Sequence, residues 1–255
     1  MPELDLDADG YLIDLDGTLI AGRNLLPDAQ WLLEQVRGRF VIVSNNAEHT
    51  PGQLARALRG MGLEVDKEQL LLAGTAAIDT MAEEYPGAAV LLLGSASLRT
   101  YARRKGLRLD APRPDLVLVA RDRHFSYARL AAAAEALSDG ARFFVAAPDR
   151  NHPGANGKPV PETGALAAAI LSCVGPIPHR VIGKPEPALF EMGCARLGVS
   201  ARHALMIGDN PETDGLGSQR IGMRFLRVER GLIRTARAVL PPRCQLTPDR
   251  AEARE

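Results

Sequence analysis

The sequence predicts an α/β fold built on a doubly wound parallel sheet. Short apolar runs that end in Gly, Ser, Asn or Asp recur along the chain, and segments with helical periodicity separate most of them. The length of 255 residues permits one large domain or two modest ones. Strands that alternate with helices form parallel sheets, and such sheets bind ligands beyond the carboxyl ends of their strands.

The predicted elements follow one another in order along the chain. The predicted strands are residues 11–15, 40–43, 70–73, 90–93, 116–119, 143–146, 180–182, 204–207 and 224–228. The predicted helices include residues 29–37, 53–61, 76–84, 127–137, 164–174 and 187–197. The polar residues that close the strands are therefore the candidate functional residues.

Composition excludes several classes of partner. The chain has 31 basic and 31 acidic residues and a formal net charge of zero, which is not the electrostatic footprint of a protein that binds nucleic acid or an anionic membrane. No apolar run is long enough to span a bilayer, and the acidic N-terminus lacks the layout of a secretory signal. Cys173, Cys194 and Cys244 are scattered, so we expect buried thiols in a reducing cytoplasm. The polar tail after Pro242 is expected to be loosely ordered.

Two carboxylates, Asp14 and Asp16, close the first apolar run. Residues i and i+2 of a strand point to the same face, and two like charges roughly 4 Å apart at an effective dielectric near 20 repel by about 4 kcal/mol. A fold avoids that repulsion unless a cation, a shared proton or a chemical role offsets it. The alternative is a helix N-cap Asp beside a turn Asp.

The next two candidate strand ends carry phosphate-binding residue types. Ser44-Asn45-Asn46 offers a hydroxyl, side-chain amides and backbone N–H groups, which suit a phosphate or, equally, a turn. Lys184 supplies a point charge for phosphate, although most lysines are solvated surface residues. A second Gly-Lys-Pro at residues 157–159 has no predicted strand before it and is interpreted as a loop.

Two more aspartates follow the strand predicted at residues 204–207. Asp209 stands directly at its end, and Asp214 stands where a following helix or tight loop begins. Each alone is explained equally well as a turn or N-cap residue. Four polar strand ends in one α/β chain are much harder to attribute to turns.

Four motifs therefore stand in a fixed order: Asp14-x-Asp16-Gly17-Thr18, Ser44-Asn45-Asn46, Gly183-Lys184-Pro185 and Gly208-Asp209-Asn210-x-x-Thr213-Asp214. This set resembles the haloacid dehalogenase (HAD) superfamily, and the middle segments 74–77, 122–127 and 163–166 resemble its class IIA branch. That branch contains p-nitrophenyl, ribonucleotide, sugar, phosphoglycolate and pyridoxal phosphatases. The resemblance implies a Rossmann-like core of residues 1–74 and 179–255, with residues 75–178 inserted as an α/β cap of the C2 type.

The resemblance implies a phosphatase mechanism with separate roles for the acid pair. Asp14 would be the nucleophile that forms an aspartyl phosphate, and Asp16 would be the general acid and base. The negative charge of Asp14 is then expected to raise the pKa of Asp16. Ser44, Asn45 and Lys184 would bind the transferring phosphoryl group.

The acidic residues also imply a cation, for which the resemblance indicates Mg²⁺. Its ligands would be Asp14, the backbone carbonyl of Asp16, and Asp209. Asp214 and Asn210 would act around these ligands, Asp214 by holding a metal-bound water or the lysine of the third motif.

The inserted cap would decide which leaving group is accepted. The loop of residues 146–153 resembles the specificity loop of the branch, so Arg150 or His152 is expected to contact the leaving group, with a solvated loop as the alternative. Ala147 stands where relatives often have Asn, and Glu162 stands where they usually have Gly. These changes in the cap leave the physiological substrate open. The expected partner is a small phosphorylated metabolite, and relatives are often homodimers.

Two other classes of function compete with a phosphatase. A signalling receiver domain also has an acidic pair, a phosphorylated Asp and a Lys on a doubly wound sheet. The large insertion, the built-in acid/base Asp16 and a chain about twice as long argue against it. A catalytically silent binding protein on the same fold is disfavoured because the acidic residues and Lys184 are all present. Dehalogenation is disfavoured because an Asp at position 16 suits phosphoryl transfer.

Overall fold

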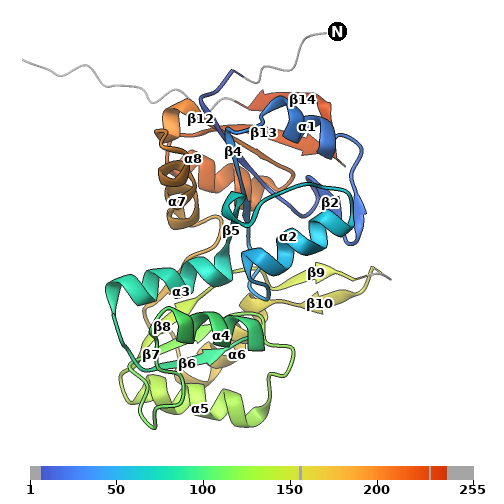
Figure 1. The fold of residues 1–255 in the computed structure, drawn as a ribbon. Coiled ribbons are helices and arrows are strands. Elements are labelled where there is room, and N and C mark those ends of the chain that lie inside the picture. The colour runs from blue at the N-terminus through green and yellow to red at the C-terminus, as the bar shows by residue number, and fades with distance from the viewer. Residues whose placement is uncertain (1–6, 155–156, 230, 240–255) are drawn as a thin grey trace, which may run out of the picture.

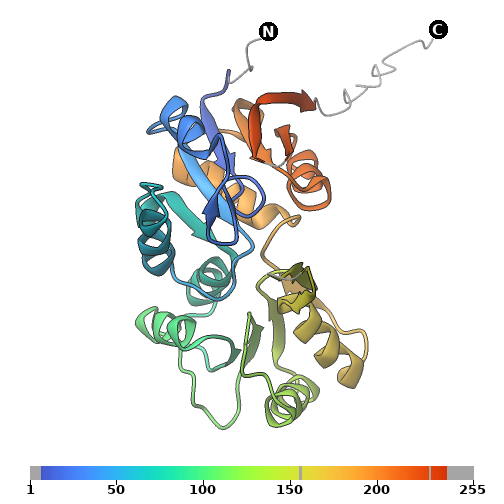
Figure 2. The same ribbon diagram turned by 90° about the vertical axis from the view of Figure 1, so that its right-hand side faces the viewer.

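The computed structural model describes residues 7–154, 157–229 and 231–239, and these form two α/β units that each contain a parallel sheet (Figures 1 and 2). The six-stranded sheet has the order β14-β13-β12-β1-β4-β5, in which only β14 runs antiparallel to its neighbour. The four-stranded sheet has the order β11-β8-β7-β6 and is parallel throughout. The predicted fold class is confirmed.

The core unit consists of two parts of the chain that flank the cap. Its elements are β1 (Gly10–Ile13), β2 (Ile20–Ala21), β3 (Asn24–Leu25), α1 (Ala29–Gln35), β4 (Phe40–Ser44), α2 (Pro51–Gly60), η1 (Lys67–Gln69), β5 (Leu70–Leu72), α7 (Pro187–Leu197), η2 (Ala201–His203), β12 (Ala204–Gly208), η3 (Pro211–Gly215), α8 (Leu216–Arg220), β13 (Arg224–Glu229) and β14 (Leu232–Val239).

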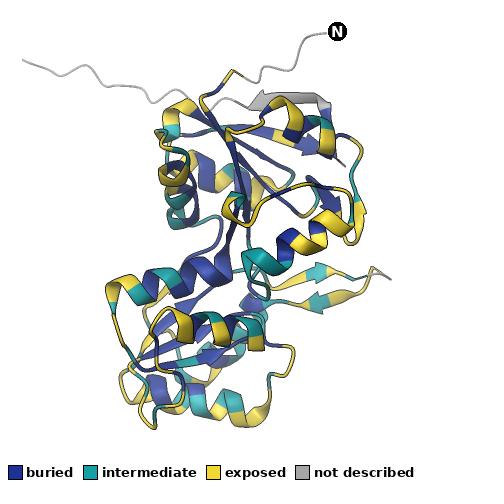
Figure 3. Cartoon of the chain, viewed as in Figure 1, coloured by how far each residue is buried: buried dark blue, intermediate teal, exposed yellow. Residues whose placement is uncertain are grey.

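Strand β1 shows why the core sheet is covered on both faces. All four of its residues are buried, so it is apolar rather than alternating. Figure 3 shows buried residues in dark blue inside both units and exposed residues in yellow on the outer helices. Leu12 belongs to the same apolar cluster as Phe190 of α7, whereas Ile13 clusters with Leu32 of α1 and Leu58 of α2. Successive strand residues point to opposite faces, so helices from different parts of the chain pack on the two sides.

The cap unit repeats this layered arrangement on a smaller scale. Its elements are α3 (Ala73–Glu84), β6 (Val90–Leu93), α4 (Ala96–Arg104), β7 (Leu116–Val119), α5 (Tyr127–Ser138), β8 (Arg142–Val145), β9 (Asn151–Pro153), β10 (Pro159–Pro161), α6 (Thr163–Val174) and β11 (His179–Val181). Leu118 packs in one apolar cluster with Ile78 of α3, while Val117 and Val119 pack with Ile170 of α6. The first cluster also contains Leu12 of the core sheet, so apolar packing is continuous between core and cap.

The chain leaves the cap slightly later than the sequence indicates. The strand predicted at residues 180–182 lies at His179–Val181 and pairs with β8 in the cap sheet. The return to the core therefore follows Val181, and the predicted boundary after residue 178 lies too early. A short Arg-Val-Ile run fits either parallel sheet, so the sequence alone does not assign it.

Other differences involve short strands and the cysteines. The hairpins β2–β3 and β9–β10 have strands of two or three residues, which carry no apolar run. The second Gly-Lys-Pro lies in the β9–β10 hairpin, where Pro159 already begins a strand, so a strand does precede this loop. Cys194 is buried but Cys173 is exposed, so the expectation of buried thiols is wrong for Cys173. Cys244 and the tail after Pro242 lie outside the described residues. Among the described helices, none is both long and apolar enough to cross a membrane.

Candidate active site

Asp14 lies at the carboxyl end of the central strand β1. Its backbone N–H donates to the carbonyl of Ile207 on β12 at 2.8 Å, which extends the parallel pairing to this residue. The side chain is buried, and Thr18 Oγ1 donates a hydrogen bond of 3.0 Å to Asp14 Oδ2. Gly17, with φ +91°, provides the turn that returns Thr18 to the strand end. Sheet pairing and this turn thus fix the carboxylate.

Lys184 is a buried cation between two aspartates. Its Nζ lies 2.5 Å from Asp14 Oδ1 and 2.7 Å from Asp214 Oδ1. Burial by itself lowers the pKa of an ammonium group, but the two carboxylates outweigh that effect and hold the pKa of Lys184 above its ordinary value. Lys184 is therefore charged and has little freedom to move.

The segment that carries Lys184 reaches the site from the cap unit. Lys184 follows β11, which pairs with β8 in the cap sheet, so this residue does not follow a strand of the core sheet as the predicted core boundaries imply. The side-chain amide of Asn45 holds the backbone of Lys184 by two hydrogen bonds. Asn45 Oδ1 accepts from the Lys184 N–H at 2.7 Å, and Asn45 Nδ2 donates to the Lys184 carbonyl at 2.9 Å. A Cβ at Gly183 would lie 2.5 Å from Asn45 Oδ1, so the close approach needs a glycine.

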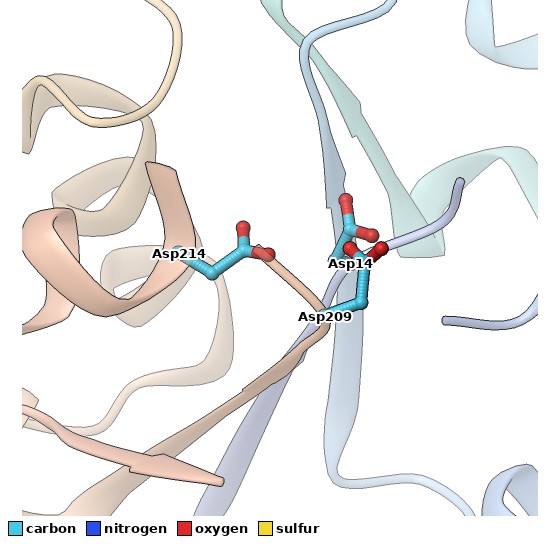
Figure 4. A group of neighbouring side chains, drawn as sticks. All are labelled: Asp14, Asp209 and Asp214. Atoms are coloured by element: carbon cyan, nitrogen blue, oxygen red, sulfur yellow. The ribbon is translucent and has the colours of Figure 1, made fainter. Parts of the chain in front are cut away.

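Asp209 completes an acidic group on the core sheet. It follows β12 and is partly exposed, and its carboxylate lies directly against the Gly17 backbone. Carboxylate oxygens of Asp14, Asp209 and Asp214 lie within 4.8 Å of one another (Figure 4). Hard divalent cations prefer such oxygen ligands, so this acidic group fits a divalent metal ion. Burial, followed by the Asp14 charge, raises the pKa of Asp209.

Asp214 is fully buried in the π-helical turn η3. Asn210 begins this turn by accepting a hydrogen bond from the Glu212 N–H at 2.9 Å, and its own N–H donates to Asp214 Oδ2 at 3.3 Å. A Cβ at Gly208 would overlap the Asp214 carboxylate. Burial raises the pKa of Asp214, and the adjacent Lys184 ammonium lowers it in part. Asp214 thus contacts the Lys184 ammonium and the Asn210 N–H, and the supporting role predicted for Asp214 and Asn210 stays a prediction.

Asp16 differs from Asp14 in its surroundings. Its side chain is accessible to solvent, yet protein lies close around it on several sides. Removal of water by these neighbours, and then the Asp14 charge, raise the pKa of Asp16 to about 6. A carboxyl group that titrates near neutrality is able both to donate and to accept a proton.

The side chains of Ser44 and Asn45 in the second motif make hydrogen bonds within the protein. Ser44 is buried at the end of β4, where its Oγ accepts from the Asn46 N–H at 3.1 Å. The side chain of Asn45 is occupied by Lys184 and by Asp149 Oδ2, to which Nδ2 donates at 2.8 Å. Both amide hydrogens of Asn45 therefore already have acceptors within the protein, and the predicted contact of Asn45 with phosphate stays a prediction.

Charged side chains of the cap form a series of ion pairs that reaches Glu48 of the core unit. His152 Nδ1 lies 2.6 Å from Glu162 Oε1, which lies 3.3 Å from Arg121 Nη1. The same Arg121 nitrogen lies 3.1 Å from Glu48 Oε2 in the core. Arg150 is exposed. Sequence reasoning placed His152 here but missed Arg121, because nothing in the sequence indicates which charges pair over such separations.

Comparison with known proteins agrees with the geometry. A family model described as haloacid dehalogenase-like hydrolase matches residues 11–108, and one described as HAD-hydrolase-like matches residues 181–249. An acid sugar phosphatase of Staphylococcus aureus is 30% identical over 226 residues, which cover 87% of this chain and 86% of the relative.

Solved structures of phosphatases are also similar. The p-nitrophenyl phosphatase from Archaeoglobus fulgidus has a TM-score of 0.80 and 29% identity, over 86% of this chain and 85% of that one. The glycerol phosphate phosphatase from Mycobacterium tuberculosis, solved with magnesium, has a TM-score of 0.82 and 33% identity, over 91% of this chain and 70% of that one.

Proposed function

The chain belongs to the haloacid dehalogenase-like hydrolases, in their class IIA branch, and from this premise we propose that it hydrolyses small phosphate monoesters through an aspartyl phosphate. The observation that carries the proposal is the buried arrangement in which Lys184 bridges Asp14 and Asp214 beside Asp209. A turn or an N-cap requires none of these contacts. Phosphoryl transfer requires a fixed nucleophile and positive charge beside it.

The acid pair divides the reaction into two steps. A carboxylate oxygen of Asp14 attacks phosphorus, the bond from phosphorus to the ester oxygen breaks, and Asp16 gives its proton to the leaving oxygen. Asp16, now a carboxylate, takes a proton from water as that water attacks the aspartyl phosphate. The bond from phosphorus to the Asp14 oxygen breaks, which releases phosphate and restores both residues. The raised pKa of Asp16 suits this exchange.

Positive charge is supplied by Lys184 and by a bound cation. Lys184 lies beside Asp14 and stabilises negative charge on the phosphoryl oxygens, and the Ser44 hydroxyl supplies a further polar contact. We propose Mg²⁺ as the cation, held by Asp14, the backbone carbonyl of Asp16, and Asp209. When bound, it neutralises the nucleophile and the incoming phosphate.

Other features of the biological setting remain predictions. The partner that we propose is a small phosphorylated metabolite, and the similar proteins described above are named for sugar, glycerol and p-nitrophenyl phosphates. Cytoplasmic location and a homodimer also remain predictions.

Release of p-nitrophenolate from p-nitrophenyl phosphate tests the proposal. We expect turnover with Mg²⁺ that is abolished by EDTA, restored by excess Mg²⁺, and lost in Asp14→Asn. The control is Glu68→Gln, because Glu68 is an exposed residue of the core unit and has no role in the site. Full activity of Asp14→Asn would refute the assignment of the nucleophile.

A further inference from the structure

Resting on the proposed phosphatase function, we propose that Asp149, a residue of the cap, is a positioning residue for Lys184. Asp149 orients the side-chain amide of Asn45, and this amide in turn holds the backbone of Lys184 beside Asp14. The cap therefore takes part in the chemical step for every substrate, in addition to the contacts with the leaving group that the sequence predicts for its loop of residues 146–153.

The side-chain amide of Asn45 joins the core, the cap loop and the catalytic lysine. Asn45 follows β4 of the core sheet. Its Oδ1 accepts from the Lys184 N–H at 2.7 Å, and its Nδ2 donates to the Lys184 carbonyl at 2.9 Å. The other hydrogen of Nδ2 is donated to Asp149 Oδ2 at 2.8 Å. Asp149 is thus the partner of Asn45 that does not belong to the lysine segment.

The Asp149 carboxylate determines which way round the Asn45 amide lies. An ionised carboxylate only accepts hydrogen bonds, so the NH₂ group of the amide, and not its oxygen, must face Asp149. Rotation of the amide by 180° would place Oδ1 against this carboxylate and against the Lys184 carbonyl, and it would leave the Lys184 N–H facing a donor. A hydrogen bond to a charged acceptor is roughly twice as strong as a neutral one. Asp149 therefore favours the one orientation in which both backbone groups of Lys184 are held.

Backbone contacts fix the position of Asp149. Its carbonyl accepts from the Gly164 N–H at 2.7 Å, at the start of α6. A Cβ at Gly164 would lie 2.8 Å from this carbonyl oxygen, so the close approach of the helix needs a glycine. The Gly183 N–H donates to the Ala146 carbonyl at 2.9 Å, which joins the same loop to the residue before Lys184. Asp149 is therefore an acceptor on a fixed backbone. Figures 1 and 2 show the β9–β10 hairpin, which begins two residues after Asp149, at the level where core and cap meet.

The position of Lys184 matters because its ammonium group contacts the proposed nucleophile. Its Nζ lies 2.5 Å from Asp14 Oδ1, and the two side chains are 3% and 9% exposed. In the proposed reaction this cation stabilises charge on the phosphoryl oxygens, which all phosphate monoesters share. A misplacement of about 1 Å can cost about 10²-fold in rate. Loss of the Asp149 acceptor should therefore slow all substrates by one factor, whereas loss of a contact with the leaving group would change one substrate relative to another.

Replacement of Asp149 tests the inference through kcat. Asp149→Ala removes the acceptor, and we expect kcat for p-nitrophenyl phosphate with Mg²⁺ to fall about tenfold, as for other residues that orient a catalytic group. KM should stay within about twofold, because the lost interaction acts in the transition state. Asp149→Leu keeps the bulk without an acceptor, so it should match Asp149→Ala and replaces it where that variant does not fold. Asp149→Asn keeps an acceptor for Asn45 and should return kcat to within about threefold of the wild type.

A double-mutant cycle tests whether Asp149 acts through Asn45. Asn45→Ala removes the amide, so adding Asp149→Ala to it should change kcat by less than about twofold. Phenyl phosphate and glycerol 3-phosphate are the second and third substrates, and Asp149→Ala should lower kcat/KM for each by the same factor as for p-nitrophenyl phosphate. The matched control is Asp115→Ala, because Asp115 Oδ2 also accepts one hydrogen bond, from the Ala89 N–H at 2.9 Å, but both partners belong to the cap. This control should leave kcat unchanged, and kcat of every variant is referred to its folded fraction.

Several results would overturn the inference. They are a wild-type kcat in Asp149→Ala or Asp149→Leu, a fall that Asp149→Asn does not relieve, an undiminished effect of Asp149→Ala in the Asn45→Ala background, and a fall that differs between the three substrates. Absence of p-nitrophenyl phosphate hydrolysis in the wild type would instead overturn the proposed function.

Discussion

Replacing Lys184 by methionine should separate the stability of the site from its activity. The ammonium group is 2.5 Å from Asp14 and 2.7 Å from Asp214, and its side chain is 3% exposed. Removing one partner of a buried ion pair leaves an uncompensated charge, which destabilises by about 3–5 kcal/mol. We expect Lys184→Met to lower the free energy of unfolding by that amount. We also expect kcat to fall by about 10²–10³-fold, because charge on the phosphoryl oxygens loses a donor.

A double variant tests the physical reason. Adding Asp214→Asn to Lys184→Met removes one of the stranded carboxylates, so about 2 kcal/mol of stability should return while activity stays low. Urea unfolding in EDTA measures stability without a bound cation, and p-nitrophenyl phosphate measures kcat. The reasoning fails if Lys184→Met is as stable as the wild type, or if the double variant is no more stable than the single one.

Two further predictions concern the neighbours of the acidic group. Gly17→Ala should abolish activity, because an added Cβ would overlap the Asp209 carboxylate at φ +91°; Gly22→Ala, at φ +62° with open space, should cost only about 1–2 kcal/mol of stability and leave kcat unchanged. Burial raises the pKa of Asp149, so the folded protein binds this proton more tightly than the unfolded chain, and the stability contributed by the group falls as pH rises from about 4. Asp149→Asn keeps an acceptor for Asn45, so unfolding experiments should show the variant gaining stability relative to the wild type as the pH rises above about 4, whereas a constant difference would contradict the assignment.

The sequence predicts the acidic part of the site well because strand order and strand ends determine it. Asp14 and Asp209 follow β1 and β12, which pair in parallel, so their carboxylates must lie at the same edge. The repulsion expected between the neighbouring acids Asp14 and Asp16 predicts a compensating positive charge, and a bound metal ion stays a prediction. In the described structure Lys184 provides part of that compensation.

The other features of the site depend on contacts between segments that are far apart in the sequence. Lys184 reaches the site from a cap strand, and an apolar run of three residues does not reveal which sheet it joins. The Asn45 side chain is available to phosphate in the sequence but is occupied by Lys184 and Asp149 in the structure. Glu162 stands out as an unusual residue, but its pairing with Arg121 emerges only when the cap folds.

The covalent intermediate on Asp14 is the most direct test of the central claim. p-Nitrophenolate leaves without help from an acid, so Asp16→Asn should complete the first step with Mg²⁺ and stall at the second. Acid quenching followed by peptide mass spectrometry should then find one phosphoryl group on Asp14, together with a burst of p-nitrophenolate equal to the enzyme present. A burst with no phosphoryl group on Asp14, or with the group on another residue, would contradict the account.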